Sequence, residues 1–296
     1  MKCFYHDDLD GRCAGAIVSK YENQFNGDYG KECFFEVGYL KPLPLDKVKD
    51  GEKVYLVDYS FKRDTVWQLE KLITEMKCDV VWIDHHDSSL NLQEDEEYIW
   101  TKDIKGWRSK EASGAALTYM YLFSKDFDEI PYFVKLVSDY DCWHFKFDPD
   151  TTHFKLGIET EDYDALDVIW TTLLKEGNTL ADDTMIKRLA NIGTTIKGYI
   201  DKDNKSYRDA YAYETEIAGI KCLAVNRKSN SWVFGEKYNE YPIVMVYAFN
   251  GEKWSYSIFS GDKTVDCSKI AESYGGGGHM GAAGFSLDDM PFKKLA

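Results

Sequence analysis

Three short apolar runs near the start of the chain each end in acidic or imidazole side chains. They are residues 3–5, followed by His6-Asp7-Asp8-Leu9-Asp10-Gly11; residues 53–57, followed by Asp58; and residues 78–83, followed by Asp84-His85-His86. Helical spacing follows at 13–18 and 62–76, and strands that alternate with helices are typical of an α/β fold with a parallel sheet. Since ligands of such sheets gather beyond the carboxyl ends of the strands, we expect these side chains to meet at one edge.

The remaining pattern predicts two domains. The chain has 296 residues, of which 44% are hydrophobic, enough for two ordinary cores. We expect a first domain over 1–180 and a helical linker over 181–205, where the polar residues 201–206 interrupt the helical spacing. A smaller α/β domain with a mixed sheet is expected over 206–296. Its strands are predicted at 217–225, 243–249 and 254–259, with Asn250-Gly251 as a hairpin turn between the last two.

Cysteine use and charge limit the class of protein. The seven cysteines form no close pair and the start of the chain lacks the apolar stretch of a signal peptide, so reduced thiols and a cytoplasmic location are expected. The apolar runs are much shorter than the roughly 18 residues of a membrane span. A net charge of -15 argues against binding of long duplex nucleic acid. It is compatible with a small phosphorylated substrate, because carboxylates that hold divalent cations attract phosphate through the bound ions.

The acids and imidazoles predict a metal site for phosphate chemistry. A donor set without thiolates suits Mn²⁺, Mg²⁺ or Fe²⁺ better than a structural zinc ion. A further acid is expected after the apolar run 131–137, where Asp139 and Asp141 compete for the role. Since five or six donors exceed the needs of one ion, we expect two ions, about 3.5 to 4 Å apart, that share a carboxylate. Such a pair activates water for the hydrolysis of a phosphate ester.

Taken in order, the motifs resemble those of the DHH phosphoesterases. His6-Asp7-Asp8-Leu9-Asp10-Gly11 is similar to the first motif of that family, Asp58 to the second, Asp84-His85-His86 to the third and Asp139 to the fourth. Gly275-Gly276-Gly277-Gly278-His279, followed by Ala282-Ala283-Gly284-Phe285, resembles the glycine-rich signature of the DHH-associated C-terminal domain. The resemblance covers residues 3–143 and 220–286, and it implies a catalytic DHH domain followed by a substrate-binding domain.

The resemblance also implies roles for individual residues. One metal would be held by His6, Asp8 and Asp58, and the other by Asp10, Asp58, His85 and Asp139, with Asp58 as the bridge. His86 would face the substrate phosphate, and Asp84 would accept a hydrogen bond that orients a histidine. Substrate would be bound by Gly276, Gly277, Gly278 and His279. One departure is that His6 stands two residues before Asp8, whereas many relatives place this histidine four residues before the aspartate.

The glycine run admits other interpretations. Successive glycines let backbone N–H groups approach a phosphate closely, but a flexible turn has the same composition. The spacing of Gly276, Gly278 and Gly281 also fits a dinucleotide-binding motif, which would need a preceding strand where residues 268–273 are helical in pattern. Many relatives carry an arginine after the serine that corresponds to Ser257; this chain does not, and Arg227 and Lys228 are candidates for that phosphate contact. Trp143 and Tyr274 are candidates for base stacking.

The expected function is that of an enzyme. The resemblance implies a manganese-dependent, two-metal phosphodiesterase, close to the small oligoribonuclease and cyclic-nucleotide branch, that hydrolyses short oligonucleotides to nucleoside monophosphates. A cyclic mono- or dinucleotide, or a 3',5'-bisphosphate nucleotide, is the alternative substrate, and a non-catalytic nucleotide sensor is the alternative class. The expected partner is a short oligonucleotide or small nucleotide, and a homodimer stays open.

Overall fold

The computed structural model describes residues 1–175, 184–261 and 264–295, and for His279 its backbone alone. The chain divides into two compact units, Met1–Ile196 and Lys197–Ala296. The helix α8 (Thr184–Tyr211) runs from the first unit into the second and continues through residues 201–206. The sequence pattern suggested that these polar residues interrupt the helix, but the helix runs through them without a break.

The first unit is built on a four-stranded sheet. Its elements are β1 (Lys2–His6), α1 (Leu9–Phe25), β2 (Phe34–Val37), β3 (Lys53–Val57), α2 (Trp67–Glu70), β4 (Asp79–Ile83), α3 (Asp87–Glu94), α4 (Gly114–Phe123), α5 (Tyr132–Asp141), α6 (Asp150–Ile158), α7 (Val168–Leu173) and the first part of α8. The strands lie in the order β2-β1-β3-β4, and all neighbouring pairs are parallel. The predicted parallel α/β sheet is thus confirmed.

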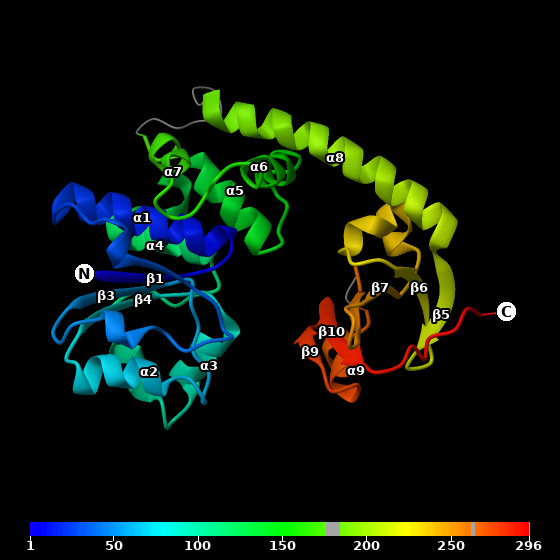
Figure 1. Ribbon diagram of the computed structural model, residues 1–296, viewed down its shortest axis with the longest axis horizontal. Helices are drawn as coiled ribbons and strands as arrows, with labels where there is room; N and C mark the ends of the chain where they lie inside the picture. Colours follow the sequence, from blue (N-terminus) through cyan, green and yellow to red (C-terminus); the bar gives the residue numbers. More distant parts are fainter. Residues whose placement is uncertain (176–183, 262–263, 296) are drawn as a thin grey trace. The chain divides into compact units, whose positions relative to one another are not determined.

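Alternating side chains of the strands pack into two cores on opposite faces of this sheet. Tyr5, Val57 and Ile83 belong to the core beneath α1, α4 and α5, whereas Leu56 and Trp82 belong to the core on the face of α2. Figure 1 shows α1 and α4 on one face of the sheet and α2 on the other. Burial on both faces fixes the strands, and all three strands that carry the motif residues end at the same edge.

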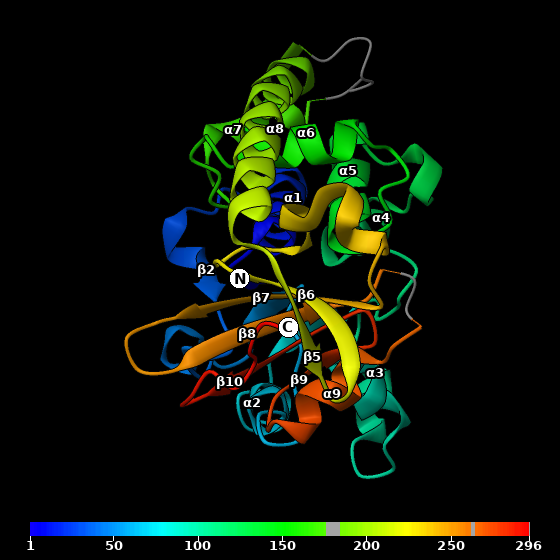
Figure 2. The ribbon, with the colours of Figure 1, turned by 90° about the vertical axis from the view of Figure 1, so that its right-hand side faces the viewer.

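The second unit contains a six-stranded mixed sheet. Its elements after α8 are β5 (Tyr213–Ile217), β6 (Ile220–Asn226), β7 (Ile243–Phe249), β8 (Trp254–Phe259), α9 (Cys267–Ser273), β9 (Gly277–His279) and β10 (Ala282–Leu287). The order is β5-β6-β7-β8-β10-β9, in which only β6 and β7 pair in parallel. Figure 2 shows these strands in a second view. The mixed sheet matches the expected fold class.

Several elements differ from the sequence expectation. β2, β9 and β10 were not predicted, and the strand expected over 217–225 is two strands joined at Ala218-Gly219, both of which have positive φ. The apolar run before Asp139 lies in α5. None of the described helices is long and apolar enough to cross a membrane.

Candidate metal centre

Asp58 occupies an unusual position at the end of β3. Its backbone is left-handed, with φ of 53°, and its side chain is 1% exposed. Neither carboxylate oxygen has a hydrogen-bond partner among the described residues. A buried carboxylate without donors carries a large desolvation cost unless a cation or proton compensates it. The carboxylate of Asp58 is therefore a candidate ligand for a cation.

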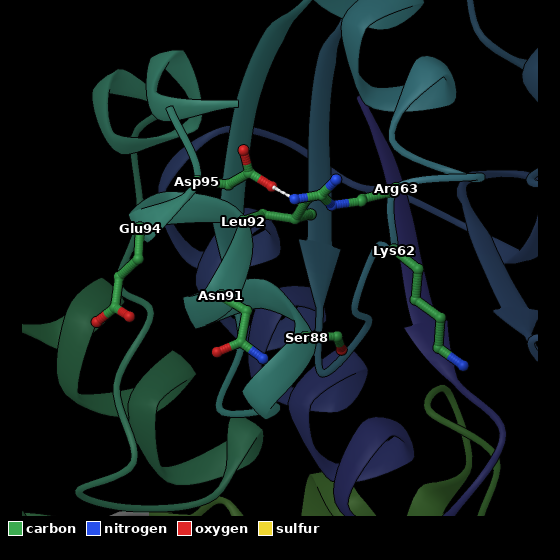
Figure 3. Close-up of a pocket in the computed structure, with 7 residues that line it drawn as sticks. All are labelled: Lys62, Arg63, Ser88, Asn91, Leu92, Glu94 and Asp95. Carbon is green, nitrogen blue, oxygen red and sulfur yellow. Dashed lines mark ion pairs between the residues drawn. The ribbon is translucent and has the colours of Figure 1, made fainter. Parts of the chain in front are cut away.

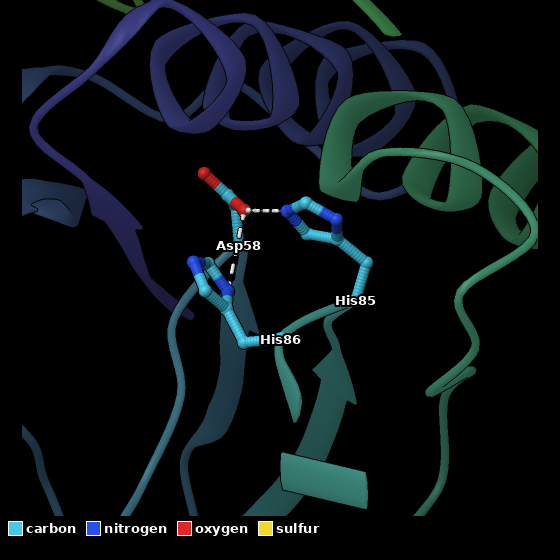
Figure 4. A group of neighbouring side chains, drawn as sticks. All are labelled: Asp58, His85 and His86. Carbon is cyan, nitrogen blue, oxygen red and sulfur yellow. Dashed lines mark ion pairs between the residues drawn. The ribbon is translucent and has the colours of Figure 1, made fainter. Parts of the chain in front are cut away.

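Histidines approach the two oxygens of Asp58 from different elements. On Oδ1, the Nε2 atom of His85 lies at 3.3 Å and the Nδ1 atom of His86 at 3.9 Å. Figure 4 shows these two rings on different sides of the carboxylate. On Oδ2, the Nδ1 atom of His6 lies at 3.8 Å. Asp58 thus presents one oxygen to each of two donor groups, which is the arrangement a bridging carboxylate needs.

The structure gathers three overlapping groups of donors. In each group one donor atom per residue lies within 4.8 Å of the others, and the groups are Asp58, His85 and His86; His85, Asp141 and Cys142; and His6, Asp8 and Asp58. Asp8 also caps α1 and accepts a hydrogen bond from the backbone N–H of Gly11, at 2.9 Å. The acids and imidazoles that follow β1, β3 and β4 therefore meet at one edge of the sheet, as the sequence predicted.

Of the two competing acids of the fourth motif, Asp141 belongs to a donor group and Asp139 does not, so the ligand role of Asp139 remains a prediction. Asp141 lies at the end of α5 with its Oδ2 atom 3.2 Å from Nε2 of His85. The carboxylate of Asp139 is buried and points into its own loop, where it accepts hydrogen bonds from the backbone N–H groups of Lys146 and Phe147 and from the hydroxyl of Thr151. Its lone pairs are thus used in holding the turn after α5.

A thiol joins the donors that the sequence predicted. Cys142 is grouped with His85 and Asp141, whereas the predicted donor set contained no cysteine. The sequence could have indicated Cys142 as a candidate donor, because it directly follows Asp141 in the fourth motif. A thiol at this place adds a soft donor to a set of hard oxygens and imidazoles.

Asp10 lies beside the cluster but is held by α4. Its buried carboxylate accepts hydrogen bonds from the Ser113 hydroxyl, at 2.5 Å, and from the backbone N–H of Ala115, at 3.2 Å. Ser113 is also the N-cap of α4. Asp10 is absent from the three donor groups, so its expected ligand role remains a prediction.

Asp84 orients His86. The Oδ1 atom of Asp84 lies 2.8 Å from Nδ1 of His86, and its other oxygen accepts a hydrogen bond from the Ser89 hydroxyl. Asp84 is fully buried, whereas His86 is about one-third exposed. A hydrogen bond at Nδ1 fixes the ring and leaves the Nε2 edge for another partner. Ser89 was missed in the sequence because it belongs to the following helix.

The charges of the site favour the binding of a cation. Burial, followed by the charges of Asp10 and Asp8, raises the pKa of Asp58 well above its usual value. Burial and Asp10 likewise raise the pKa of Asp141 to about 7. Burial lowers the pKa of His85, but its hydrogen bond with Cys142 and the charge of Asp10 outweigh this effect and raise it to about 10. Crowded carboxylates with raised pKa values are stabilised by cations, and the donor types fit divalent metals.

The glycine run forms part of a sheet. Gly277, Gly278 and His279 form β9, which pairs with β10 at the edge of the second sheet. A Cβ at Gly276 would lie 2.1 Å from the carbonyl oxygen of Gly284, and Gly278 has φ of 147°, so both positions require glycine. Gly277 faces open space. The side chain of His279 lies outside the described part of the chain.

The candidates for an alternative phosphate contact lie together in the second unit. Arg227, Lys228, Ser255 and Ser257 line one hollow. Arg227 pairs with Asp203 at 2.5 Å, and its Nη1 atom is buried without a hydrogen-bond partner. The structure thus brings a guanidinium to the neighbourhood of Ser257, although the sequence has no arginine directly after that serine.

Another hollow lies in the first unit, and the charges of the residues that line it are balanced. Lys62, Arg63, Ser88, Asn91, Leu92, Glu94 and Asp95 line it, and Arg63 pairs with Asp95 at 2.5 Å (Figure 3). Because two cationic side chains and two carboxylates line it, this hollow has no net attraction for a phosphate. We assign no ligand to it.

Comparisons with known proteins agree with this fold. The chain has the fold of a DHH domain described as a member of the s1p family of ribosomal proteins, with a TM-score of 0.60, 14% identity and coverage of 95% of this chain and 81% of that one. It is also similar to the pGpG-specific phosphodiesterase PggH of Vibrio cholerae, with a TM-score of 0.53, 12% identity and coverage of 97% and 94%. The expected fold, that of a DHH domain, is therefore confirmed.

Two curated proteins are similar to the chain in sequence. The chain is 23% identical over 310 residues to the oligoribonuclease NrnB of Bacillus subtilis, an alignment that covers 98% of this chain and 73% of NrnB. It is 24% identical over 264 residues to an uncharacterized protein of Acanthamoeba polyphaga mimivirus and spans 58% of that protein's length. No protein-family model matches the chain.

Proposed function

We propose that the protein is a manganese-dependent, two-metal phosphodiesterase that hydrolyses short oligonucleotides to nucleoside monophosphates. The observation that carries this proposal is the buried carboxylate of Asp58, which has no hydrogen-bond partner and lies among donors from three strand ends. Two divalent ions at such a site supply an activated water and stabilise charge on the attacking and leaving oxygens. The name of NrnB supports the choice of substrate.

The residues would divide the work by position. His6, Asp8 and Asp58 would hold one ion, while Asp58, His85 and Asp141 would hold the other, with Asp10 and Cys142 beside them. His86 is more exposed than the other two histidines. Held by Asp84 at Nδ1, it would use Nε2 to contact the substrate phosphate or to protonate the leaving oxygen.

The second unit would bind the rest of the substrate. Its glycine strand β9 is an edge strand, and Gly277 can be approached closely because no atom lies within 4 Å of its missing Cβ. Arg227 and Lys228 line a hollow with Ser257 and would supply positive charge for a second phosphate. In this proposal residues 1–180 catalyse, and residues 206–296 anchor a nucleotide.

The test is a panel of substrates with added Mn²⁺. Linear di- and trinucleotides, a cyclic dinucleotide, a cyclic mononucleotide, a 3',5'-bisphosphate nucleotide and pyrophosphate are incubated with wild type, Asp58→Asn and Asp79→Asn. Asp79 is an exposed acid at the opposite end of β4, so its variant is a matched control. We expect the linear substrates to be cleaved fastest, Asp58→Asn to lose at least about 100-fold in kcat, in line with the loss of a transition-state charge contact, and Asp79→Asn to resemble wild type.

The outcomes separate the alternatives. Preference for a cyclic or bisphosphate substrate would keep the chemistry and replace the substrate. Tight binding without turnover of any substrate would identify a sensor. Full activity of Asp58→Asn would contradict the two-metal site itself.

A further inference from the structure

Tyr39 places an aromatic ring at the edge of the metal centre. It lies two residues after β2, and its ring centroid is 4.9 Å from that of His6 and 6.3 Å from that of His86. Among the described residues, it is the one ring of Phe, Tyr or Trp that contacts the histidines of the cluster. Tyr39 is 44% exposed. A large apolar surface is therefore available beside the proposed ligand His6 and the proposed phosphate contact His86.

The ring is supported from below by other aromatic side chains. Tyr39 stacks on Tyr59, with ring centroids 5.1 Å apart and planes at 19°. Tyr59 packs on Phe61, which in turn packs on the buried Trp82. Trp82 donates its indole N–H to the carbonyl of Tyr59 at 2.8 Å. This column connects the exposed ring to the core on the α2 face of the sheet.

The hydroxyl of Tyr39 is also held in place. It accepts hydrogen bonds from the backbone N–H and the hydroxyl of Ser60, at 3.3 and 3.2 Å. The backbone before it approaches the loop after β1 closely, because a Cβ at Gly38 would lie 2.9 Å from an oxygen of Asp7. A ring fixed at its face and its hydroxyl loses little conformational entropy when a ligand binds on it.

We propose that Tyr39 is the platform on which a nucleobase adjacent to the scissile phosphate stacks. The inference rests on the proposed function, which puts a phosphate at His86. A nucleoside attached to that phosphate would lie within reach of the neighbouring ring. Stacking on an aromatic face is tolerant of base identity. Tyr39 would therefore make the enzyme selective for nucleotide esters over phosphate esters that lack a base, with little preference for sequence.

The experiment compares Tyr39→Leu, Tyr39→Phe and the control Phe25→Leu. Phe25 is an exposed aromatic residue at the far end of α1, about 25 Å from the cluster given the length of a 17-residue helix. The substrates are a dinucleotide and its two singly abasic analogues. Tyr39→Leu is expected to lower kcat/KM for the dinucleotide by about 5- to 150-fold, the range of base–aromatic stacking, mainly through KM. Tyr39→Phe keeps the ring and should stay within about threefold of wild type, because each Ser60 hydrogen bond is a weak neutral one.

The abasic substrates decide whether the ring contacts a base. For one of them, wild type should show the same loss that Tyr39→Leu shows on the intact dinucleotide, and Tyr39→Leu should suffer no further loss. The proposal that Tyr39 binds a base is wrong if the losses in kcat/KM from the substitution and from removal of the base multiply for both analogues. It is also wrong if Tyr39→Leu and Phe25→Leu have the same kcat/KM for the dinucleotide. If wild type cleaves no dinucleotide, the proposed function fails separately. The platform is then tested by quenching of 2-aminopurine ribonucleotide 5'-phosphate fluorescence, which must weaken in Tyr39→Leu and is overturned by equal quenching.

Discussion

Asp58 combines a strained backbone with an uncompensated charge. A non-glycine residue in the left-handed region costs about 1 kcal/mol or more, and a buried carboxylate without donors adds to that cost. Both features are absent from an ordinary strand end. In the proposed site, a metal ion bound to the folded state would offset this cost by mass action.

Replacement of Asp58 by asparagine should stabilise the metal-free protein. Because the pKa of Asp58 is raised in the folded state, the folded chain holds this proton more tightly than the unfolded chain. The protonated carboxyl group of Asp58 contributes stability at low pH, and this contribution is lost as the pH rises through the raised pKa. In chelator, Asp58→Asn should therefore be more stable than wild type at pH 8, and the difference should vanish toward pH 4.

Urea unfolding at several pH values measures this difference. With Mn²⁺ in excess the order should reverse, because only wild type gains stability from the ions. Asp79→Asn serves as the control and should follow wild type under both conditions. A metal-free Asp58→Asn that is less stable than wild type at pH 8 would show that the carboxylate is already compensated.

Asp139 and Asp141 should separate stability from metal binding. Asp139→Asn weakens the acceptors for two backbone N–H groups and a threonine hydroxyl, which should cost about 1 to 3 kcal/mol of stability even in chelator. Asp141→Asn should not lower the metal-free melting temperature, because the pKa of Asp141 is raised in the folded state, but it should reduce the rise caused by Mn²⁺. Melting curves with and without the metal measure both effects. If Asp139→Asn instead reduced the rise caused by Mn²⁺ and Asp141→Asn lowered the metal-free stability, Asp139 would be the ligand.

At the scale of elements, α4 holds the site from above the sheet. Gly114 is its first residue, and a Cβ there would lie 2.6 Å from the Cβ of Asp58 and 2.8 Å from Oδ1. The same helix start binds Asp10 through Ser113 and Ala115. The position of two proposed site residues therefore depends on how closely one helix approaches the strand ends.

Gly114→Ala should displace Asp58. We expect a loss of about 1 to 3 kcal/mol from overpacking and about 100-fold in kcat/KM, as for other small misplacements of reacting groups. Gly198→Ala in α8 is the matched control, since nothing lies within 4 Å of its missing Cβ. It should be neutral or stabilise by up to about 1 kcal/mol. Unfolding and dinucleotide hydrolysis are measured together, and a fully active Gly114→Ala would contradict the tight contact.

The sequence predicted the elements whose pattern is local. The bounds of β3, β7 and β8 agree with the expected runs, because strongly apolar segments between polar turns are unambiguous. The glycine strand β9 has no such pattern and owes its form to pairing with β10. Which of Asp139 and Asp141 lies beside His85 depends on the direction of each side chain at the end of α5. Both acids have similar sequence surroundings, so only the packing of the turn distinguishes them.

At the scale of the whole molecule, the acidic character and the site belong together. The net charge of -15 would repel a phosphorylated substrate at long range. The donors converge from β1, β3 and β4, so bound cations would reverse the sign of the field at the place where the phosphate must lie. The loops after β2 and α5 place Tyr39 and Cys142 beside these donors.

Electron paramagnetic resonance of the Mn²⁺-loaded protein tests whether Asp58 bridges two metal ions. Two manganese ions that share a carboxylate are exchange-coupled, whereas isolated ions give uncoupled spectra. We predict a coupled spectrum with two Mn²⁺ per chain for wild type and Asp79→Asn, and at most one uncoupled Mn²⁺ for Asp58→Asn. An uncoupled spectrum from fully loaded wild type, or a coupled one from Asp58→Asn, would contradict the account.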